Sequence, residues 1–336
     1  MKQLVIPRYG PPDVLRVREV ADPAVTPNAV RIRVRAAGIN FSDLLARQGL
    51  YPGAPKPPAV VGYEVAGVVD AVGSGASGLP LGSKVIALTK FGGQSELVVV
   101  PAANVFPLPG NWSFEEGAAF PVVYLTAHHM LTRVAAARRG ETVLIHAAAG
   151  GVGLAVAELA RLLGLRLIGL ASRGKHDILR GYGVEPLDAR DPRWPEAVRA
   201  IAPGGVDIVL DAVGGDSWRH GYDLLAPMGR LVCYGAQELS TGGGRNFLRL
   251  AWRVLRWPRF APLKLMSQNR AVLGVNLGNL WDAAEIIRPQ VEVLLRYAVE
   301  GKIRPKVDRA FPLEEGAAAH RYIHERRNVG KVVLTP

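Results

Sequence analysis

A glycine-rich turn between two apolar stretches carries the clearest chemical signal in this sequence. The turn contains Gly150, Gly151, Val152 and Gly153. It follows the apolar run 143–145 and precedes a helical stretch at 154–163. A strand, a glycine-rich turn and a helix in this order are typical of dinucleotide-binding proteins, because the pyrophosphate sits on free N–H groups of the helix N-terminus. The turn departs from the usual three-glycine pattern, since Ala148 stands where the first glycine is expected.

The residues after the next expected strand indicate which nucleotide binds. Proteins that prefer NAD carry an acidic residue about 20 positions beyond the glycines, where it holds the ribose 2′-hydroxyl. Residues 171–176 contain no acid there, but they do contain Ser172, Arg173 and Lys175. One hydroxyl and two cations suit a 2′-phosphate, so the sequence predicts NADPH rather than NADH. The alternative is that these are ordinary solvated loop residues.

Composition places the chain among globular proteins. It has 336 residues, of which 49% are hydrophobic and 21% charged, and this length favours two domains. The single cysteine, Cys233, excludes a disulfide framework within the chain and a cysteine-rich zinc site. No apolar run reaches the ~18 residues of a membrane span, and the N-terminus lacks a signal-peptide pattern. We therefore expect a cytoplasmic protein.

The pattern of expected strands and helices indicates an α/β fold. Apolar strand-like runs at 143–145, 166–171, 206–211, 230–234 and 271–275 alternate with helical stretches. Such alternation is typical of a doubly wound parallel sheet, the Rossmann architecture. Residues 1–110 read as mostly β. A helix is expected at 281–298. After it, the chain returns to β structure, with strands at 306–311 and 331–334 and a helix at 316–326 between them. We expect a nucleotide domain inserted between two parts of a catalytic domain.

The formal net charge of the chain is +12, and the basic segment 245–260 concentrates part of this positive charge. Arg249, Arg253 and Arg256 repeat at helical spacing, and apolar residues lie between them: Phe247, Leu248, Leu250, Trp252 and Leu255. Three interpretations remain open: a helix that covers the sheet, a lid over the substrate, or a weak contact with anionic membrane. Nucleic-acid binding is not expected, because no binding module is present.

Several motifs resemble the medium-chain dehydrogenase/reductases along the whole chain. The matching stretches are residues 37–43, 46–52, 146–153, 206–211 and 327–333. Within that superfamily the sequence is similar to the zinc-free quinone oxidoreductase (zeta-crystallin) group, and there to the branch of the synaptic vesicle membrane protein related to vesicle amine transport. The resemblance implies a GroES-like catalytic domain at 1–123, a Rossmann NADPH-binding domain at 124–268, and a return to the catalytic domain within 269–336.

The resemblance also implies further cofactor contacts. These are Asn40, Thr126, Gly235, Val275, Leu277, Arg326 and Asn328. It argues against catalytic zinc, because Asn40 stands near the place of a zinc-binding cysteine and Tyr63 in Gly62-Tyr-Glu64 stands at the place of a histidine. His320 and His324 are four apart, but we expect them on a solvated helix face rather than as metal ligands.

Without a Lewis acid, an acceptor activated by conjugation is easier to reduce than a simple ketone. Hydride can add to a quinone or an α,β-unsaturated carbonyl if hydrogen-bond donors meet the developing oxyanion. We take Asn40 and Tyr51 as catalytic candidates, and either Tyr51 or solvent as the source of the final proton. The competing hypotheses are a nucleotide-binding, lipid-associated protein with little catalysis and an enoyl-thioester reductase. A homodimer is expected, with 271–275 as a plausible edge strand.

Overall fold

The protein is described by a computed structural model for residues 1–76, 78–240 and 247–336, with side chains of the last range from residue 251 onward. The described residues form two compact units. Unit 1 comprises residues 1–125 and 278–336, and unit 2 comprises residues 126–240 and 247–277. Within these ranges no helix is both long and apolar enough to cross a bilayer.

Unit 2 is built on a six-stranded sheet in which every neighbouring pair is parallel. Its strands, in spatial order, are β10 (Glu185–Asp188), β9 (Arg166–Ala171), β8 (Thr142–His146), β11 (Val206–Asp211), β12 (Leu225–Cys233) and β13 (Ala271–Gly274). The order runs outward in both directions from the β8–β11 pair, so this pair is the topological switch point. Val143, Leu144 and Ile145 are fully buried, as expected for a strand covered on both faces.

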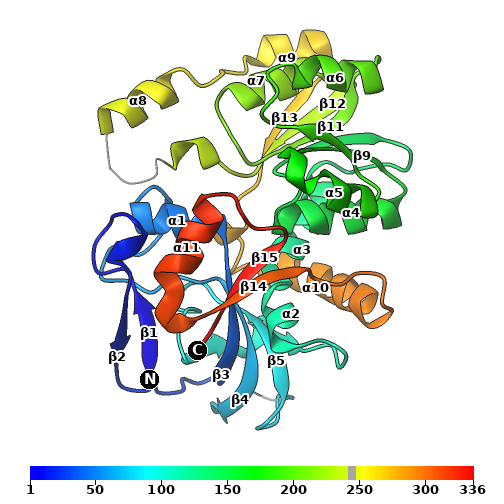
Figure 1. Cartoon of the computed structure of the whole chain (residues 1–336). Helices are drawn as coiled ribbons and strands as arrows, with labels where there is room; N and C mark the ends of the chain where they lie inside the picture. The colour runs from blue at the N-terminus through cyan, green and yellow to red at the C-terminus, as the bar shows by residue number, and fades with distance from the viewer. Residues whose placement is uncertain (77, 241–246) are drawn as a thin grey trace. The chain divides into compact units, whose positions relative to one another are not determined.

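Helices of unit 2 connect these strands along the chain (Figure 1). They are α4 (Gly151–Leu163), α5 (His176–Gly181), α6 (Trp194–Ile201), α7 (Asp216–Asp223), α8 (Phe247–Leu255) and α9 (Pro262–Gln268). The prediction of a helix in the basic segment is confirmed for α8. Residues 245 and 246, and the side chains of residues 247–250, lie outside what the structure describes.

Unit 1 is mostly β, as predicted. Its larger sheet has the order β14–β15–β3–β4–β5–β7, with β6 also paired to β3. These strands are β3 (Ala29–Ile39), β4 (Glu64–Val72), β5 (Lys84–Leu88), β6 (Leu97–Pro101), β7 (Val105–Pro107), β14 (Val307–Pro312) and β15 (Lys331–Thr335). β1 (Lys2–Val5) and β2 (Arg16–Glu19) form a separate antiparallel pair. The C-terminal strand β15 pairs with β3, so both ends of the chain build one sheet.

The remaining helices lie between these strands along the chain. They are α1 (Phe41–Gln48), α2 (Phe114–Ala118), α3 (Pro121–His128), α10 (Ala284–Val299) and α11 (Gly316–His324), with a π-helical turn at His129–Val134. Short 3-10 turns occur at Pro12–Val14, Ala102–Asn104, Arg173–Lys175, Gln237–Leu239, Leu277–Asn279 and Leu313–Glu315.

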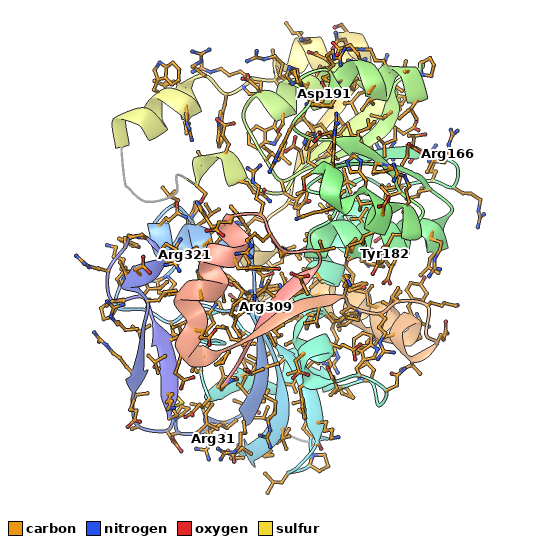
Figure 2. The ribbon with its side chains drawn as sticks, viewed as in Figure 1. Arg31, Arg166, Tyr182, Asp191, Arg309 and Arg321 are labelled. Carbon is orange, nitrogen blue, oxygen red and sulfur yellow. The ribbon has the colours of Figure 1, made fainter. Side chains whose placement is uncertain are left out.

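The expectation for His320 is wrong. Its side chain is 0% exposed in α11, and neither ring nitrogen has a hydrogen-bond partner among the described residues. Burial, followed by the nearby charge of Arg47, lowers the pKa of His320 to about 3. Arg321, the next residue of the same helix (Figure 2), instead reaches outward and pairs with Asp13 at 2.5 Å. The helix therefore buries the face that carries His320.

Candidate functional site

The predicted nucleotide turn lies at the switch point of the unit 2 sheet. Gly150 is the N-cap of α4, and Gly151, Val152 and Gly153 form its first turn. The first N–H groups of a helix have no partner within the helix, so they are free to meet an anion. The residue in left-handed conformation is Ala147, with φ 54°, rather than any of the three glycines. The turn thus reaches its shape with an alanine at the position where a glycine is easiest to accommodate.

Two glycines of the turn differ in what surrounds them. A Cβ on Gly153 would lie 2.1 Å from the carbonyl oxygen of Ala148, so close packing inside the protein demands glycine there. A Cβ on Gly150 would meet only the carbonyl oxygen of Ala147, at 3.3 Å, among the described atoms. Gly150 has φ −79° and ψ 176°, which any residue adopts. Packing therefore leaves room for a Cβ at Gly150 but not at Gly153.

The predicted 2′-phosphate residues lie at the carboxyl end of β9. Ser172 follows the strand, and Arg173 and Lys175 lie in the 3-10 turn after it. The Nε atom of Arg173 donates to the Asp188 carboxylate at 2.9 Å. A backbone N–H from Arg190, and next the Arg173 side chain, lower the pKa of Asp188. An ionised acid therefore does lie at this edge of the sheet, at the end of β10 rather than of β9.

The other predicted cofactor residues of unit 2 lie on neighbouring elements. Gly235 follows β12, and a Cβ there would lie 2.8 Å from the carbonyl oxygen of Ala212. Val275 follows β13, and its N–H donates to the carbonyl oxygen of Cys233 at 2.9 Å. Thr126 lies in α3 and Leu277 in a 3-10 turn, and both are buried. Parallel strands end at one edge, so the structure gathers the residues after β8, β9, β12 and β13 there.

Unit 1 contains a buried polar cluster around Asn40. The Nζ atom of Lys331 lies 2.5 Å from Oδ1 of Asn40 and 2.5 Å from Oε1 of Glu64. Nδ2 of Asn40 donates to the same Glu64 oxygen at 2.9 Å. The second carboxylate oxygen of Glu64 accepts the backbone N–H of Val122 at 2.7 Å. Glu64 is 0% exposed and Lys331 4%, whereas Asn40 is half-buried.

Antiparallel pairing explains why these three side chains meet. Asn40 follows the end of β3, while Glu64 and Lys331 begin β4 and β15, two of the strands that pair with β3. Because both strands run antiparallel to β3, its end lies beside their beginnings. Gly38 in β3 leaves the necessary space, since a Cβ there would lie 2.6 Å from Oε1 of Glu64.

Asp43 completes the cluster from the first turn of α1. Its carboxylate accepts the backbone N–H of Asn40 at 2.7 Å and that of Gly62 at 3.0 Å. Burial is the dominant effect and raises the pKa of Asp43 to about 7, although these two hydrogen bonds and the charge of Lys331 oppose it. The cluster therefore contains a carboxyl group that changes its charge near neutral pH.

The other residues predicted in this unit make contacts of their own. The ring of Tyr51 packs edge-to-face on Tyr63, with 6.1 Å between centroids. Arg326 follows α11 with φ 57°. The side-chain amide of Asn328 donates to the carbonyl oxygen of Gly330 at 2.8 Å. These contacts involve partners other than Asn40, Glu64 and Lys331.

Sequence reasoning missed four residues of these sites, namely Asp43, Glu64, Asp188 and Lys331. Lys331 gave one signal, since a lysine opens the otherwise apolar strand of residues 331–334. Nothing in the sequence linked it to Asn40, which lies 291 positions away. Asp188 was overlooked because the acid was sought at the end of the second strand of the sheet, not of the third.

The cluster of unit 1 also bears on metal binding. In the part of the chain that the structure describes, no group of three or more His, Cys, Asp or Glu side chains is arranged to hold a metal ion. At the position discussed for zinc, the oxygen atoms of Asn40 and Glu64 are already bound by the ammonium of Lys331. A divalent cation there would meet that positive charge within a few ångström, so the residues present do not fit zinc.

Comparisons with known proteins agree with the two-part architecture. Residues 26–110 match the alcohol dehydrogenase GroES-like domain, and residues 185–334 match the family described as zinc-binding dehydrogenase. The chain is 41% identical to the synaptic vesicle membrane protein VAT-1 homolog of Rattus norvegicus, over 100% of this chain and 84% of the relative. It is 34% identical to a quinone oxidoreductase of Pseudomonas aeruginosa, over 100% and 99%. The Escherichia coli quinone oxidoreductase complexed with NADPH superposes with a TM-score of 0.86 at 28% identity, over the whole of both chains.

Proposed function

Because the chain belongs to the medium-chain dehydrogenase/reductase superfamily, close to VAT-1 homologs and quinone oxidoreductases, we propose that it reduces quinones or other activated α,β-unsaturated carbonyls with NADPH and without zinc. The observation that carries the proposal is the Asn40 carboxamide, held between a buried ammonium and a buried carboxylate. This arrangement offers a fixed hydrogen-bond donor and uses no metal.

NADPH, when bound, supplies a hydride to the acceptor. In the proposal the first turn of α4, from Gly150 to Gly153, holds the pyrophosphate on its free N–H groups. Ser172, Arg173 and Lys175 hold the 2′-phosphate, and Thr126, Gly235, Val275, Leu277, Arg326 and Asn328 make further contacts. The two cations favour the phosphorylated cofactor over NADH, because a 2′-phosphate accepts charge-assisted hydrogen bonds that a hydroxyl does not.

In the same proposal Asn40 acts on the acceptor. Hydride addition to a conjugated carbonyl places negative charge on oxygen, and a preorganised N–H donor stabilises that charge. The Nδ2 atom of Asn40 has two hydrogens, one of which is used by Glu64. Its second hydrogen is the donor we assign to the oxyanion. Tyr51 supplies a second donor, and either its hydroxyl or solvent delivers the final proton.

The test is NADPH oxidation by the purified protein with a panel of ortho- and para-quinones, enones, an enoyl thioester and a simple ketone. We expect turnover with the conjugated acceptors and little with the simple ketone. Preference for the enoyl thioester would redirect the proposal to enoyl-thioester reduction. Absence of NADPH oxidation with every acceptor would overturn the proposal.

A second candidate function rests on α8 and α9. Trp252, Leu255, Leu263 and Met266 are 57–79% exposed, and the guanidinium of Arg256 lies 4.5 Å from the Trp252 ring centroid. Exposed apolar side chains beside cations are typical of a surface that meets anionic lipid. In this alternative the protein binds NADPH and membranes but turns over little. Cosedimentation with anionic vesicles, together with negligible quinone reduction, would favour it.

Assembly and location complete the proposal. β13 is the last strand of the unit 2 sheet, so its free edge can pair with a second copy. We propose a homodimer on this basis and, independently of it, a cytoplasmic location. Light scattering during size-exclusion chromatography measures the mass directly, and a mass of one chain at micromolar concentration would contradict it.

A further inference from the structure

We propose that Lys331 is a positioning residue of the reductase, because it fixes which end of the Asn40 carboxamide faces the acceptor. The inference rests on the proposed function and adds a residue to it. Lys331 begins β15, near the C-terminus, and Asn40 follows β3, near the N-terminus. The pairing of β15 with β3 brings the two side chains together.

The chemistry of the two charged neighbours determines the orientation of the amide. An ammonium group has three donors and no acceptor, so it can bind only the oxygen of a carboxamide. An ionised carboxylate accepts and does not donate, so it can bind only the NH₂ group. Lys331 and Glu64 contact opposite ends of the Asn40 amide, at 2.5 and 2.9 Å. A flipped amide would place like groups against each other at both ends, so one orientation is strongly favoured.

Further contacts hold the two charged neighbours themselves. Lys331 and Glu64 pair at 2.5 Å, and Glu64 also accepts the Val122 N–H at 2.7 Å. Both side chains lie in the interior, where an ion pair is weakly screened and has one good geometry. The orientation of Asn40 is therefore imposed by buried neighbours rather than selected by the ligand. Lys331 acts through Asn40 and contacts the acceptor only by way of it.

Replacing Lys331 alone leaves the Glu64 charge buried without its partner, which can prevent folding. The informative variant is therefore Lys331→Met with Glu64→Gln, which removes both charges together. The amide that Glu64→Gln introduces can donate or accept, so it no longer selects one orientation of Asn40. We expect kcat with a quinone to fall by about 10- to 100-fold, with KM for NADPH changed by less than about twofold. Lys331→Arg keeps a charged donor, so its kcat should lie between wild type and the double variant.

A matched control comes from another ion-paired lysine of unit 1. Lys90 pairs with Asp282 at 2.8 Å, but both side chains are mostly exposed. Lys90→Met should leave kcat unchanged. To distinguish an effect through Asn40 from a purely structural role of Lys331, the same double variant is also made in an Asn40→Ala background. If Lys331 acts through Asn40, little further loss of kcat follows there; a full, additive loss would overturn the inference.

A readout without turnover separates this inference from the proposed function. The side-chain NH₂ signals of Asn40 are identified in a nitrogen-15 NMR spectrum by their loss in Asn40→Ala. One hydrogen bonded to a carboxylate should make the two protons strongly inequivalent, and Glu64→Gln alone, which removes that carboxylate, is the reference. If Lys331 holds the amide, adding Lys331→Met to this reference should change the two signals further. Unchanged signals would overturn the role of Lys331 even if quinones are reduced. Changed signals would support it even if the wild type reduces none of the acceptors.

Discussion

The carbonyl oxygen of Ala148 lies 2.1 Å from the point that a Cβ would occupy on Gly153. The α4 helix thus begins in direct contact with the backbone of the turn before it. No flexible side chain is involved, so the backbone itself must move if this contact is overfilled.

Gly153→Ala should therefore destabilise the protein, by about 1–3 kcal/mol, and weaken NADPH binding because the first turn of α4 shifts. Urea unfolding and a fluorescence titration with NADPH measure the two effects. Gly181→Ala is the matched control, since Gly181 lies in α5 and its Cβ would meet nothing within 4 Å. Equal stability of both variants would show that the turn is not closely packed.

Gly150→Ala should separate binding from stability. Its Cβ would meet only the Ala147 oxygen at 3.3 Å, so urea unfolding should change by less than about 1 kcal/mol. The same methyl group would stand where we place the pyrophosphate, and NADPH affinity should fall at least about tenfold, or ~1.4 kcal/mol. An unchanged affinity would mean that the pyrophosphate does not approach Gly150.

Arg173→Ala combined with Lys175→Ala should change which cofactor is preferred. Loss of two charge-assisted contacts should raise KM for NADPH by about 10- to 100-fold and leave KM for NADH nearly unchanged. Steady-state kinetics with both cofactors provide the measurement. Arg180→Ala removes another exposed arginine of unit 2, paired with Asp177 at 2.6 Å, and should alter neither value. A parallel rise for both cofactors would contradict recognition of a 2′-phosphate.

His320→Leu should stabilise the protein. The neutral imidazole is buried, and neither nitrogen is paired within the described part of the chain, so an apolar side chain of similar size should add about 1–3 kcal/mol to the free energy of unfolding. The variant should also resist acid better. The pKa of His320 is about 3 in the folded protein and about 6.5 in the unfolded chain, so the unfolded chain binds this proton at a higher pH. Wild-type stability is therefore lost as pH falls from about 6.5 toward 3.

Urea unfolding between pH 4 and 8 tests both statements about His320. His324→Leu, one turn later and half-buried, serves as the control and should change stability less. Lower stability of His320→Leu at every pH would show that the imidazole makes favourable contacts in solution.

Asp43 should give the opposite pH dependence. Its pKa is raised to about 7 in the folded protein, so the folded chain holds this proton longer, and stability is lost as pH rises from about 4 through 7. The His320 contribution overlaps this window, so the comparison is between His320→Leu and the same variant with Asp43→Asn. Only the former should lose stability over that range. Tyr63, Glu64 and Lys331 surround this carboxyl and remain in both variants.

Local pattern was sufficient for much of this fold. The alternation of apolar runs and helical stretches predicted five strands of the parallel sheet, since a strand buried on both faces is apolar throughout. It did not predict β10, whose short sequence at the edge of the sheet has no apolar run. Ser113 and Glu116 have the three-residue spacing of a capping box, and the structure contains one at the start of α2, with hydrogen bonds of 3.2 and 2.8 Å. Periodicity did not reveal which face of α11 is buried. His320 was therefore assigned wrongly to solvent.

The sequence by itself determined the class of fold, the place of the glycine-rich turn and the family, because these depend on residue type and on spacing along a short stretch. Only the tertiary structure decided what surrounds Asn40. Glu64 and Lys331 reach it through antiparallel pairing between strands whose separation along the chain carries no local signal. The same holds for Asp188, which meets Arg173 because β9 and β10 are neighbours in space. Charge and hydrogen bonding act over a few ångström, so these partners became visible only once the strands were paired.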